Sequence, residues 1–380
     1  MKENPKIIGR RHFLELGITS AAALCINCGK SERSRLDVSA AQVSENHEAG
    51  FYEKLQDNLV RCVLCPRECL IEEGARGFCG TRENREGTLY SLVYGNIVAK
   101  QIDPIEKKPL YHFLPGSEAY SIATAGCNMT CKFCQNWQIS QSKPEELRSS
   151  RMSPQDVAAE AVAYKSKSIA YTYNEPTVFT EFMYDCAAEG NASGVRSVVI
   201  SNGYINPEPL EKLCEVISAY KVDLKAFSDS FYRDLTGGQR NAVLDTIKRL
   251  KKNGVWTELV HLTIPTLNDN DVDFRAMGDW LMGEIGPDIP VHFTRFHPTY
   301  RLLNLPVTPV STLERARNIL MEKGLNFVYV GNVPGHDGNS TYCPGCKKVL
   351  VKRSGYSVDI TGLKNGECNN CGINIPGVWS

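Results

Sequence analysis

The chain has 380 residues, 42% of them hydrophobic, and its 43 basic and 43 acidic side chains give a formal net charge of +0. This composition indicates a soluble globular protein with material for one large domain and smaller appendages. The balanced charge gives no electrostatic reason to expect a surface for nucleic acid or anionic membranes.

Most of the 15 cysteines stand in groups of two, three and four, which indicates metal binding rather than a disulfide framework. Thiolate-bound iron needs a reducing compartment during assembly, so we expect a protein that matures in the cytoplasm. No stretch after the leader approaches the ~20 apolar residues of a membrane span.

Residues 1–50 are predicted to form a leader and a polar linker. Arg10 and Arg11 precede an uncharged run at 16–27, which resembles a twin-arginine export signal. Glu15 stands where the hydrophobic region of such a signal should begin. The sequence therefore leaves two locations open, a cytoplasmic protein with an unstructured leader or a protein exported by the twin-arginine system.

A cysteine-rich extension is predicted over residues 51–115. Four of its cysteines have the spacing C-x2-C-x3-C-x9-C, and neighbouring proline and glycine permit tight turns. They are Cys62, Cys65, Cys69 and Cys79. Four thiols suit tetrahedral zinc or an auxiliary iron–sulfur cluster, and the sequence leaves zinc, cluster and free thiols open.

Two further segments precede the core. Residues 88–94 alternate as a β-strand does. Residues 103–113 combine two prolines with mixed charge, which predicts a rigid loop rather than a helix. The position of that loop, just before the first core strand, makes it a candidate rim of the active site.

Cys127, Cys131 and Cys134 form the pattern C-x3-C-x2-C, with Phe133 directly before the last cysteine. This spacing can direct three thiolates to three corners of one [4Fe–4S] cluster, and no fourth cysteine lies near enough to close the last iron. An open iron is a Lewis-acidic, redox-active site for a small chelating molecule. The alternatives are a zinc site, although zinc usually recruits C-x2-C pairs, or three buried structural thiols.

The core, residues 116–333, alternates apolar runs typical of buried parallel strands with amphipathic helical patterns. The predicted strands are 120–125, 168–173, 197–201, 222–227, 257–264 and 291–296, with a further strand at 327–330. The predicted helices are 154–164, 176–189, 207–217, 242–253, 271–284 and 313–323. These repeats predict an α/β fold, a partial (β/α)6 TIM-like barrel, in which ligands lie at the carboxyl ends of the strands.

Polar side chains recur at that end of successive strands. The cysteine loop follows the first strand, and the other candidates are Asn174 and Glu175, Ser201 and Asn202, Asp223 and Lys225, and His297. Each has a structural alternative, because Glu175 could cap a helix, Asp223 and Lys225 could form an ion pair, and His297 could be a core histidine.

The tail, residues 334–380, carries two C-x2-C pairs on either side of a β-rich stretch. The pairs are Cys343 with Cys346 and Cys368 with Cys371. This is the spacing of a zinc ribbon, and so short a tail needs such a metal to fold. We expect structural zinc here, with an auxiliary cluster as the alternative.

Four motifs occur together in this chain: CNMTCKFCQNW at 127–137, DPIEKKPLYHF at 103–113, YNEPT at 173–177 and VDLK at 222–225. They resemble the radical S-adenosylmethionine (SAM) enzyme of the AmmeMemoRadiSam system, a family related to the pyruvate formate-lyase activating enzymes. The resemblance covers the chain from about Arg61 onward.

The resemblance implies a role for each candidate. The three cysteines of the loop would hold a catalytic [4Fe–4S] cluster, whose free iron chelates SAM. Glu175 would contact the SAM amino group, with Asn174 in a position where glycine is usual. The remaining positions match contacts to the ribose or carboxylate (Ser201, Asn202), to the carboxylate (Asp223, Lys225) and to adenine or substrate (His297).

We therefore expect an enzyme that cleaves SAM reductively to a 5′-deoxyadenosyl radical and abstracts hydrogen from an unidentified substrate, such as a partner protein. A flavodoxin or ferredoxin would supply low-potential electrons, and the companion proteins of the system are expected partners. The alternative is a non-catalytic iron–sulfur or zinc protein that relays electrons or serves as a scaffold. The polar strand ends favour the enzyme, because an electron carrier needs no SAM pocket.

Overall fold

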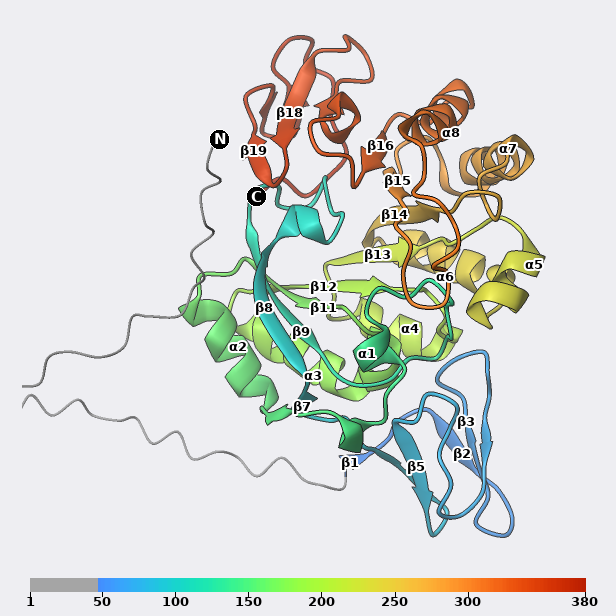
Figure 1. Cartoon of the computed structure of the whole chain (residues 1–380). Helices are drawn as coiled ribbons and strands as arrows, with labels where there is room; N and C mark the ends of the chain where they lie inside the picture. Colours follow the sequence, from blue (N-terminus) through green and yellow to red (C-terminus); the bar gives the residue numbers. More distant parts are fainter. Residues whose placement is uncertain (1–46) are drawn as a thin grey trace, which may run out of the picture. The chain divides into compact units, whose positions relative to one another are not determined.

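The computed structural model of the chain describes residues 47–380 (Figure 1). The predicted leader with its twin-arginine motif, and the predicted linker up to residue 46, lie outside the described residues. None of the described helices is both long and apolar enough to cross a membrane.

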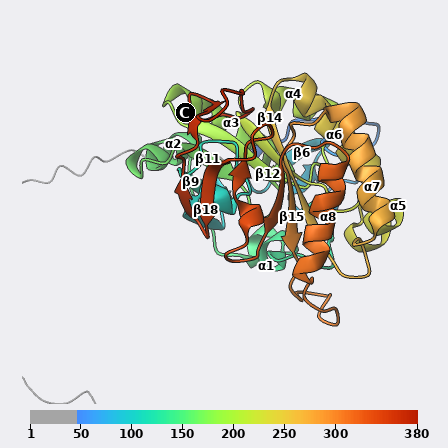
Figure 2. The ribbon, with the colours of Figure 1, turned by 90° about the horizontal axis from the view of Figure 1, so that it is seen from above.

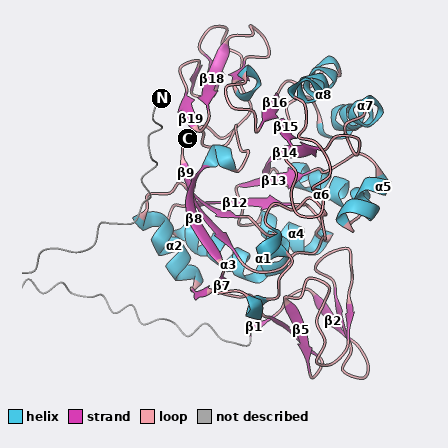
Figure 3. Cartoon of the chain, viewed as in Figure 1, coloured by secondary structure: helices cyan, strands magenta, loops and turns pink. Residues whose placement is uncertain are grey.

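An eight-stranded sheet forms the core (Figures 1 and 3), in the order β16-β15-β14-β13-β12-β11-β9-β8. Its strands are β8 (Ala99–Pro104), β9 (Glu118–Ala123), β11 (Ser168–Tyr171), β12 (Arg196–Ser201), β13 (Ala219–Asp223), β14 (Trp256–Thr263), β15 (Val291–Arg295) and β16 (Val328–Gly331). Neighbouring strands from β9 to β16 are parallel, whereas β8 runs antiparallel to β9. Because β8 and β16 end the sheet on opposite sides, the barrel is partial, and the predicted fold class is confirmed.

Helices cover the outer face of this sheet (Figure 2). The longer ones are α2 (Pro154–Ala163), α3 (Thr180–Ala192), α4 (Pro207–Cys214), α6 (Arg240–Lys252), α7 (Asp271–Trp280) and α8 (Val310–Glu322), and α1 (Trp137–Ser140) and α5 (Asp229–Phe231) are short. Strand side chains alternate between the two faces. Tyr171 and Val199 pack with the helices, whereas Ala170 and Val198 face the inside of the barrel.

Two strands depart most from the prediction, whereas the other strands of the core sheet differ from their predicted bounds by at most two residues at either end. The strand predicted at 222–227 is β13, which begins at Ala219 because the buried Lys221 is compensated by Asp223 within the sheet. Residues 99–104 form the edge strand β8, although its last residues were predicted to be a loop. An edge strand tolerates proline and exposed polar side chains, so its pattern resembles that of a connector.

The segment at 105–113 fills the amino end of the barrel and does not form the predicted rim. Leu110 and Phe113 are completely buried and pack with Ala119 and Ala219, near the starts of β9 and β13. Burying these apolar side chains is favourable, and this outweighs the polar character of the rest of the segment. The segment therefore closes the end of the barrel opposite the predicted site.

The cysteine-rich extension forms two three-stranded sheets. One joins β1 (His47–Glu48), β6 (Thr88–Ser91) and β5 (Arg82–Arg85), and the other joins β2 (Tyr52–Lys54), β3 (Val60–Cys62) and β4 (Leu70–Ile71). The completely buried Arg82 donates two hydrogen bonds, of 2.7 and 2.8 Å, to the carboxylate of Glu181 in α3. This buried ion pair fastens the extension to the barrel. The strand at β6 confirms the alternation seen at 88–94.

The tail forms a small β module from β17 (Thr341–Tyr342), β18 (Val349–Ser354), β19 (Ser357–Asp359), β20 (Leu363–Lys364) and β21 (Glu367–Cys368). The ring of His112 hydrogen-bonds to the Tyr329 hydroxyl (2.6 Å) and to the Pro376 carbonyl (2.7 Å). Leu350 and Val351 share a core with Tyr329 of β16. The module is thus anchored to the amino end of the barrel.

Candidate active site

The cysteine loop leaves the carboxyl end of β9 and is held by backbone hydrogen bonds. Gly126 has a left-handed φ of 86°, a conformation that favours glycine, and turns the chain into the loop. The N–H of Thr130 donates to the Thr236 carbonyl (2.8 Å), and the N–H of Lys132 donates to the Leu235 carbonyl (2.9 Å). The loop is therefore fixed against the segment that follows β13.

The three thiols of the loop leave room for a cluster. Among the described residues, Cys127, Cys131 and Cys134 are not a set whose sulfur atoms all lie within 4.8 Å of one another, as ligands of a single ion would. The N–H of Met129 donates to the Cys127 sulfur at 3.4 Å. Burial raises the pKa of the Cys131 thiol to about 11, so a thiolate here needs a cation such as iron. The donor set fits a [4Fe–4S] cluster with one open iron.

Glu175 ties together the carboxyl ends of β11 and β12. Its Oε1 accepts hydrogen bonds from the Thr177 N–H (3.0 Å), the Thr177 hydroxyl (2.8 Å) and the Ser201 hydroxyl (2.6 Å). Its Oε2 accepts one from the Asn202 N–H (2.9 Å). Burial raises the pKa of Glu175, and these four hydrogen bonds oppose that rise. Glu175 thus caps η3 (Pro176–Phe179), as the structural alternative predicted, and lies beside Ser201 and Asn202.

Asn202 connects this carboxylate to the cysteine loop. Its side-chain N–H donates to Oδ1 of Asn128 (2.9 Å) and lies 3.9 Å from the Cys127 sulfur. Its side-chain oxygen accepts from the Tyr204 N–H (2.8 Å), so the amide is held at both ends. A continuous set of hydrogen bonds therefore runs from Glu175 to the first cysteine.

Asn174 offers a buried acceptor at the same loop. Its Nδ2 donates to the Gly126 carbonyl (3.0 Å) and lies 3.2 Å from both the Ala125 carbonyl and the Thr124 hydroxyl. Three acceptors around this nitrogen fix the orientation of the amide, so the opposite atom is the oxygen. That oxygen is buried and has no hydrogen-bond partner among the described residues. It is available to an N–H donor of a ligand.

Asp223 and Lys225 lie together at the end of β13, with a third charge that sequence reasoning missed. Oδ1 of Asp223 pairs with the Lys221 ammonium, and Oδ2 lies 3.2 Å from Nζ of Lys225. The positive charge of Lys225 also lowers the pKa of Cys131, against the effect of burial. Two lysines and one carboxylate leave net positive charge beside the cysteine loop, which suits an anionic group of a ligand.

Comparisons with known proteins identify the family of this arrangement. Residues 121–278 match the model of the radical SAM superfamily. The chain is 46% identical over 330 residues to the uncharacterized protein MJ0808 of Methanocaldococcus jannaschii, covering 86% of this chain and 98% of that protein. The chain belongs to the radical SAM superfamily. Membership implies cleavage of SAM by a [4Fe–4S] cluster.

More distant relatives have named activities. The pyruvate formate-lyase-activating enzyme of Clostridium pasteurianum is 22% identical to this radical SAM protein over 165 residues, covering 40% of this chain and 65% of that enzyme. The solved structure of a radical SAM methyltransferase from Sphaerobacter thermophilus is similar with a TM-score of 0.45 and 18% identity, covering 57% of this chain and 67% of that one. The relation to the activating enzymes is therefore a distant one.

A second charged group in this radical SAM barrel was also missed. Asp103 of β8 accepts hydrogen bonds from Lys107 (2.7 Å), from Lys108 (2.6 Å) and from the Tyr173 hydroxyl. Lys108 is 2% exposed, and its ammonium lies 4.5 Å from the centre of the Tyr173 ring. Burial lowers the pKa of Lys108 to about 8. The charges were visible in the motif at 103–113, but their pairing with Tyr173 depends on the barrel.

His297 stands apart from these residues. It is exposed and lies two residues beyond β15, so it is not a core histidine. The buried histidine of that strand is His292, whose Nε2 lies 2.8 Å from the Glu258 carboxylate. A contact between His297 and adenine or substrate stays a prediction.

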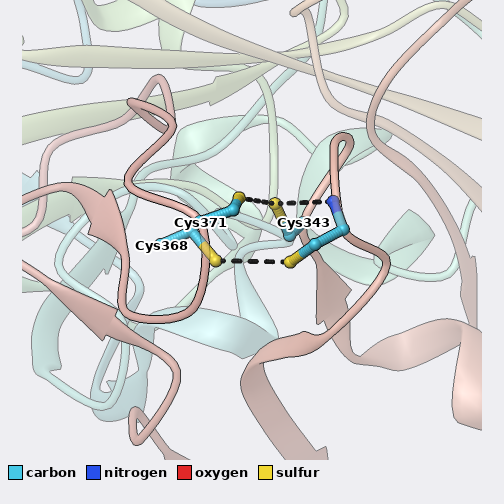
Figure 4. Close-up of side chains that lie close together, drawn as sticks. Cys343, Cys368 and Cys371 are labelled. Atoms are coloured by element: carbon cyan, nitrogen blue, oxygen red, sulfur yellow. Dashed lines mark hydrogen bonds between the residues drawn. The ribbon is translucent and has the colours of Figure 1, made fainter.

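The tail cysteines converge on one point (Figure 4). The sulfur atoms of Cys343 and Cys371 are 3.5 Å apart, and those of Cys346 and Cys368 are 3.6 Å apart. A hydrogen bond from the Lys348 N–H lowers the pKa of Cys346 to about 6, which favours the thiolate that a metal binds. All four sulfur atoms lie within 4.8 Å of one another, so this site can hold one metal ion.

The extension cysteines are arranged differently. Cys62, Cys65, Cys69 and Cys79 line one small cavity, whose wall also includes Asn128 of the cysteine loop. Cys62 and Cys65 are buried, and burial raises the pKa of Cys65 to about 12. Within the described part of the chain, no three of these four sulfur atoms gather within 4.8 Å.

Proposed function

We propose that this chain is an enzyme of the activating-enzyme-like type, in which the [4Fe–4S] cluster supplies an electron that cleaves SAM to a 5′-deoxyadenosyl radical for hydrogen abstraction from a substrate. The observation that carries the proposal is the meeting of three elements at one end of the sheet. The cysteine loop, the buried acceptor of Asn174 and the positive charge of Lys225 all lie at the carboxyl ends of β9, β11 and β13.

The residues around the loop divide the binding of SAM between them. Lys225 would hold the carboxylate, because its ammonium is a point charge beside Cys131. The Asn174 oxygen would accept from the amino group, together with Oε2 of Glu175, which accepts one hydrogen bond where Oε1 accepts three. Ser201 and Asn202 would contact the ribose or carboxylate of SAM, and their hydrogen bonds to Glu175 would hold them in position.

Exposed apolar side chains beside the cysteine loop support a partner protein as the substrate class. Trp137, just after the loop, is 40% exposed and stacks on Tyr300 with ring centres 5.2 Å apart. Leu303, further along the segment of Tyr300, is 69% exposed. Exposed aromatic and aliphatic side chains beside a reaction centre suit the apolar side chains of a protein partner. The companion proteins of the AmmeMemoRadiSam system are the partners we propose, with a flavodoxin or ferredoxin as electron donor.

Anaerobic turnover tests the proposed function. Protein reconstituted with iron and sulfide, then given dithionite and SAM, should release 5′-deoxyadenosine and methionine. Cys131→Ala should abolish this product, whereas Cys214→Ala, which removes a thiol from α4 far from the loop in sequence, should retain it. A cluster-loaded wild-type protein that releases no 5′-deoxyadenosine would contradict the proposal.

A further inference from the structure

The extension carries four cysteines that the reaction at the barrel does not use. They surround a cavity whose wall includes Leu64, Phe78 and Val178, together with Arg67 and Arg82. We propose that Cys62, Cys65, Cys69 and Cys79 bind a second iron–sulfur cluster, of the [4Fe–4S] class, beside the cysteine loop of the barrel.

The separation of the thiols distinguishes a cluster from zinc. A tetrahedral zinc ion with Zn–S bonds of about 2.3 Å holds its sulfur atoms about 3.8 Å apart. The tail cysteines meet that requirement, with sulfur pairs at 3.5 and 3.6 Å. The extension cysteines face one cavity but, among the described residues, no three of them come within 4.8 Å. In a cubane each thiolate binds a different iron, so the thiolates stand farther apart around a shared centre.

Two turns place the thiols around the cavity. The N–H of Cys62 donates to the Cys69 carbonyl (2.9 Å), and the N–H of Glu68 donates to the Cys65 carbonyl (3.1 Å). Glu68 has a left-handed φ of 44°, so this turn is kept in a conformation that non-glycine residues rarely adopt. The N–H of Gly80 donates to the Gly77 carbonyl (2.9 Å) in the second turn, which carries Cys79.

Arg67 supplies positive charge to this cavity. Its guanidinium donates to the carbonyls of Asn128 and Gly237, both at 2.6 Å, and its central carbon lies 3.4 Å from the centre of the Phe78 ring. In the described part of the chain, no carboxylate forms an ion pair with it. A cluster bound by four thiolates is anionic, so an arginine in the cavity wall whose charge is not cancelled by a carboxylate favours it.

The proposed second cluster would lie next to the first. Arg67, between Cys65 and Cys69, bonds to the backbone of Asn128, which directly follows Cys127. On the other side, the Cys79 carbonyl would lie 2.7 Å from a Cβ at Gly126, so the second turn packs on the start of the cysteine loop. Two clusters so placed would interact magnetically when both are reduced.

Metal analysis of full-length variants tests the site. The triple variant Cys127→Ala, Cys131→Ala, Cys134→Ala leaves every residue of the extension unchanged. After anaerobic reconstitution it should keep about half of the wild-type iron and acid-labile sulfide, with the Mössbauer spectrum of a [4Fe–4S] cluster. This readout needs no SAM cleavage, so it stands or fails independently of the proposed function.

The reciprocal variant, Cys69→Ala with Cys79→Ala, changes the two less buried positions and should lose the other half of the iron. Cys214→Ala is the matched control and should keep all of it. Electron paramagnetic resonance of the reduced wild type should show spin–spin broadening that is absent from both cluster-deficient variants. A triple variant that holds a second equivalent of zinc, beyond the one expected in the tail, and no iron would overturn the proposal, and so would a triple variant with neither iron nor sulfide.

Discussion

Oε2 of Glu175 accepts a hydrogen bond of 2.9 Å from the backbone N–H of Asn202. The side chain of the same asparagine reaches Asn128, the residue after the first cysteine of the loop. One buried carboxylate therefore sets the position of two strand ends and, through Asn202, of the loop that we propose holds the cluster.

Replacing Glu175 with Ala should weaken both the fold and SAM binding. The N–H groups of Thr177 and Asn202 and the Ser201 hydroxyl would lose their acceptor, and each unsatisfied buried donor costs about 1–3 kcal/mol. We expect SAM affinity to fall about tenfold or more, while iron content after reconstitution is retained. Equilibrium binding of SAM and chemical denaturation measure the two effects.

Glu175→Gln refines this test. The amide keeps the shape and one acceptor oxygen, but its NH2 group cannot accept from the Asn202 N–H. Affinity between that of wild type and Glu175→Ala is expected. Glu208→Ala, at an exposed carboxylate in α4, is the control. Unchanged SAM affinity in Glu175→Ala would show that neither contact nor positioning by Glu175 matters for the ligand.

Lys225→Met should lower SAM affinity by about ten- to a hundredfold, because a hydrogen bond between charged groups contributes about 1.5–3 kcal/mol. The methionine side chain keeps most of the volume, and Lys221 remains to compensate Asp223. Loss of net positive charge beside Cys131 should thus affect the ligand carboxylate rather than the fold. Lys212→Met, at an exposed lysine of α4, is the matched control. A variant with wild-type affinity would remove Lys225 from the site.

Sequence patterns predicted the alternation of strands and helices because period and apolar content are local properties. They also predicted which residues follow the strands, and the structure brings Glu175, Ser201 and Asn202 into direct hydrogen-bond contact. What they could not provide is pairing between side chains of different strands. The Tyr173 hydroxyl, just after β11, donates to Asp103 of β8, two strands away in the sheet, and no local pattern in either segment indicates that contact.

The three cysteine groups show the same limit. The spacing of the two C-x2-C pairs in the tail predicted one metal site. In the structure their four sulfur atoms lie within 4.8 Å of one another. In the extension, the spacing alone left zinc, a cluster and free thiols open. The proposal of a cluster rests on two features that only the structure provides: among the described residues, no three of these sulfur atoms lie within 4.8 Å of one another, and Arg67 contacts the cysteine loop.

Cys371→Ser should release the metal from the tail. We expect zinc at this site, and a serine hydroxyl is a much poorer ligand for it than a thiolate. Because the module packs on Tyr329 of the barrel, its loosening should also lower the unfolding free energy of the whole chain. Zinc analysis of aerobically purified protein, with Cys214→Ser as control, checks the first effect. Iron rather than zinc in the wild-type tail would show that the metal assignment is wrong.

Protonation of His261 should make stability depend on pH. Burial lowers the pKa of this ring to about 4, below its ordinary value of 6.5, so the folded chain holds it neutral. The unfolded chain therefore binds the proton more readily, and the stability present above about pH 6.5 is lost as the pH falls toward 4, by about 3 kcal/mol. Phe274 and Phe293 surround the ring, with centres 5.7 and 5.4 Å away, so His261→Phe fits an aromatic site without a titrating group.

The measurement is the difference in unfolding free energy between His261→Phe and wild type at about pH 7 and about pH 5. Acid effects on the metal sites are common to both proteins and cancel in this difference. The unfolding free energy of the variant should rise relative to that of wild type as the pH falls. Only the wild type loses stability, because its imidazole stays neutral in the folded chain but is protonated in the unfolded chain. A difference that does not change with pH would mean that His261 is protonated equally in the folded and unfolded chain, and hence that the packing around it admits a charged ring.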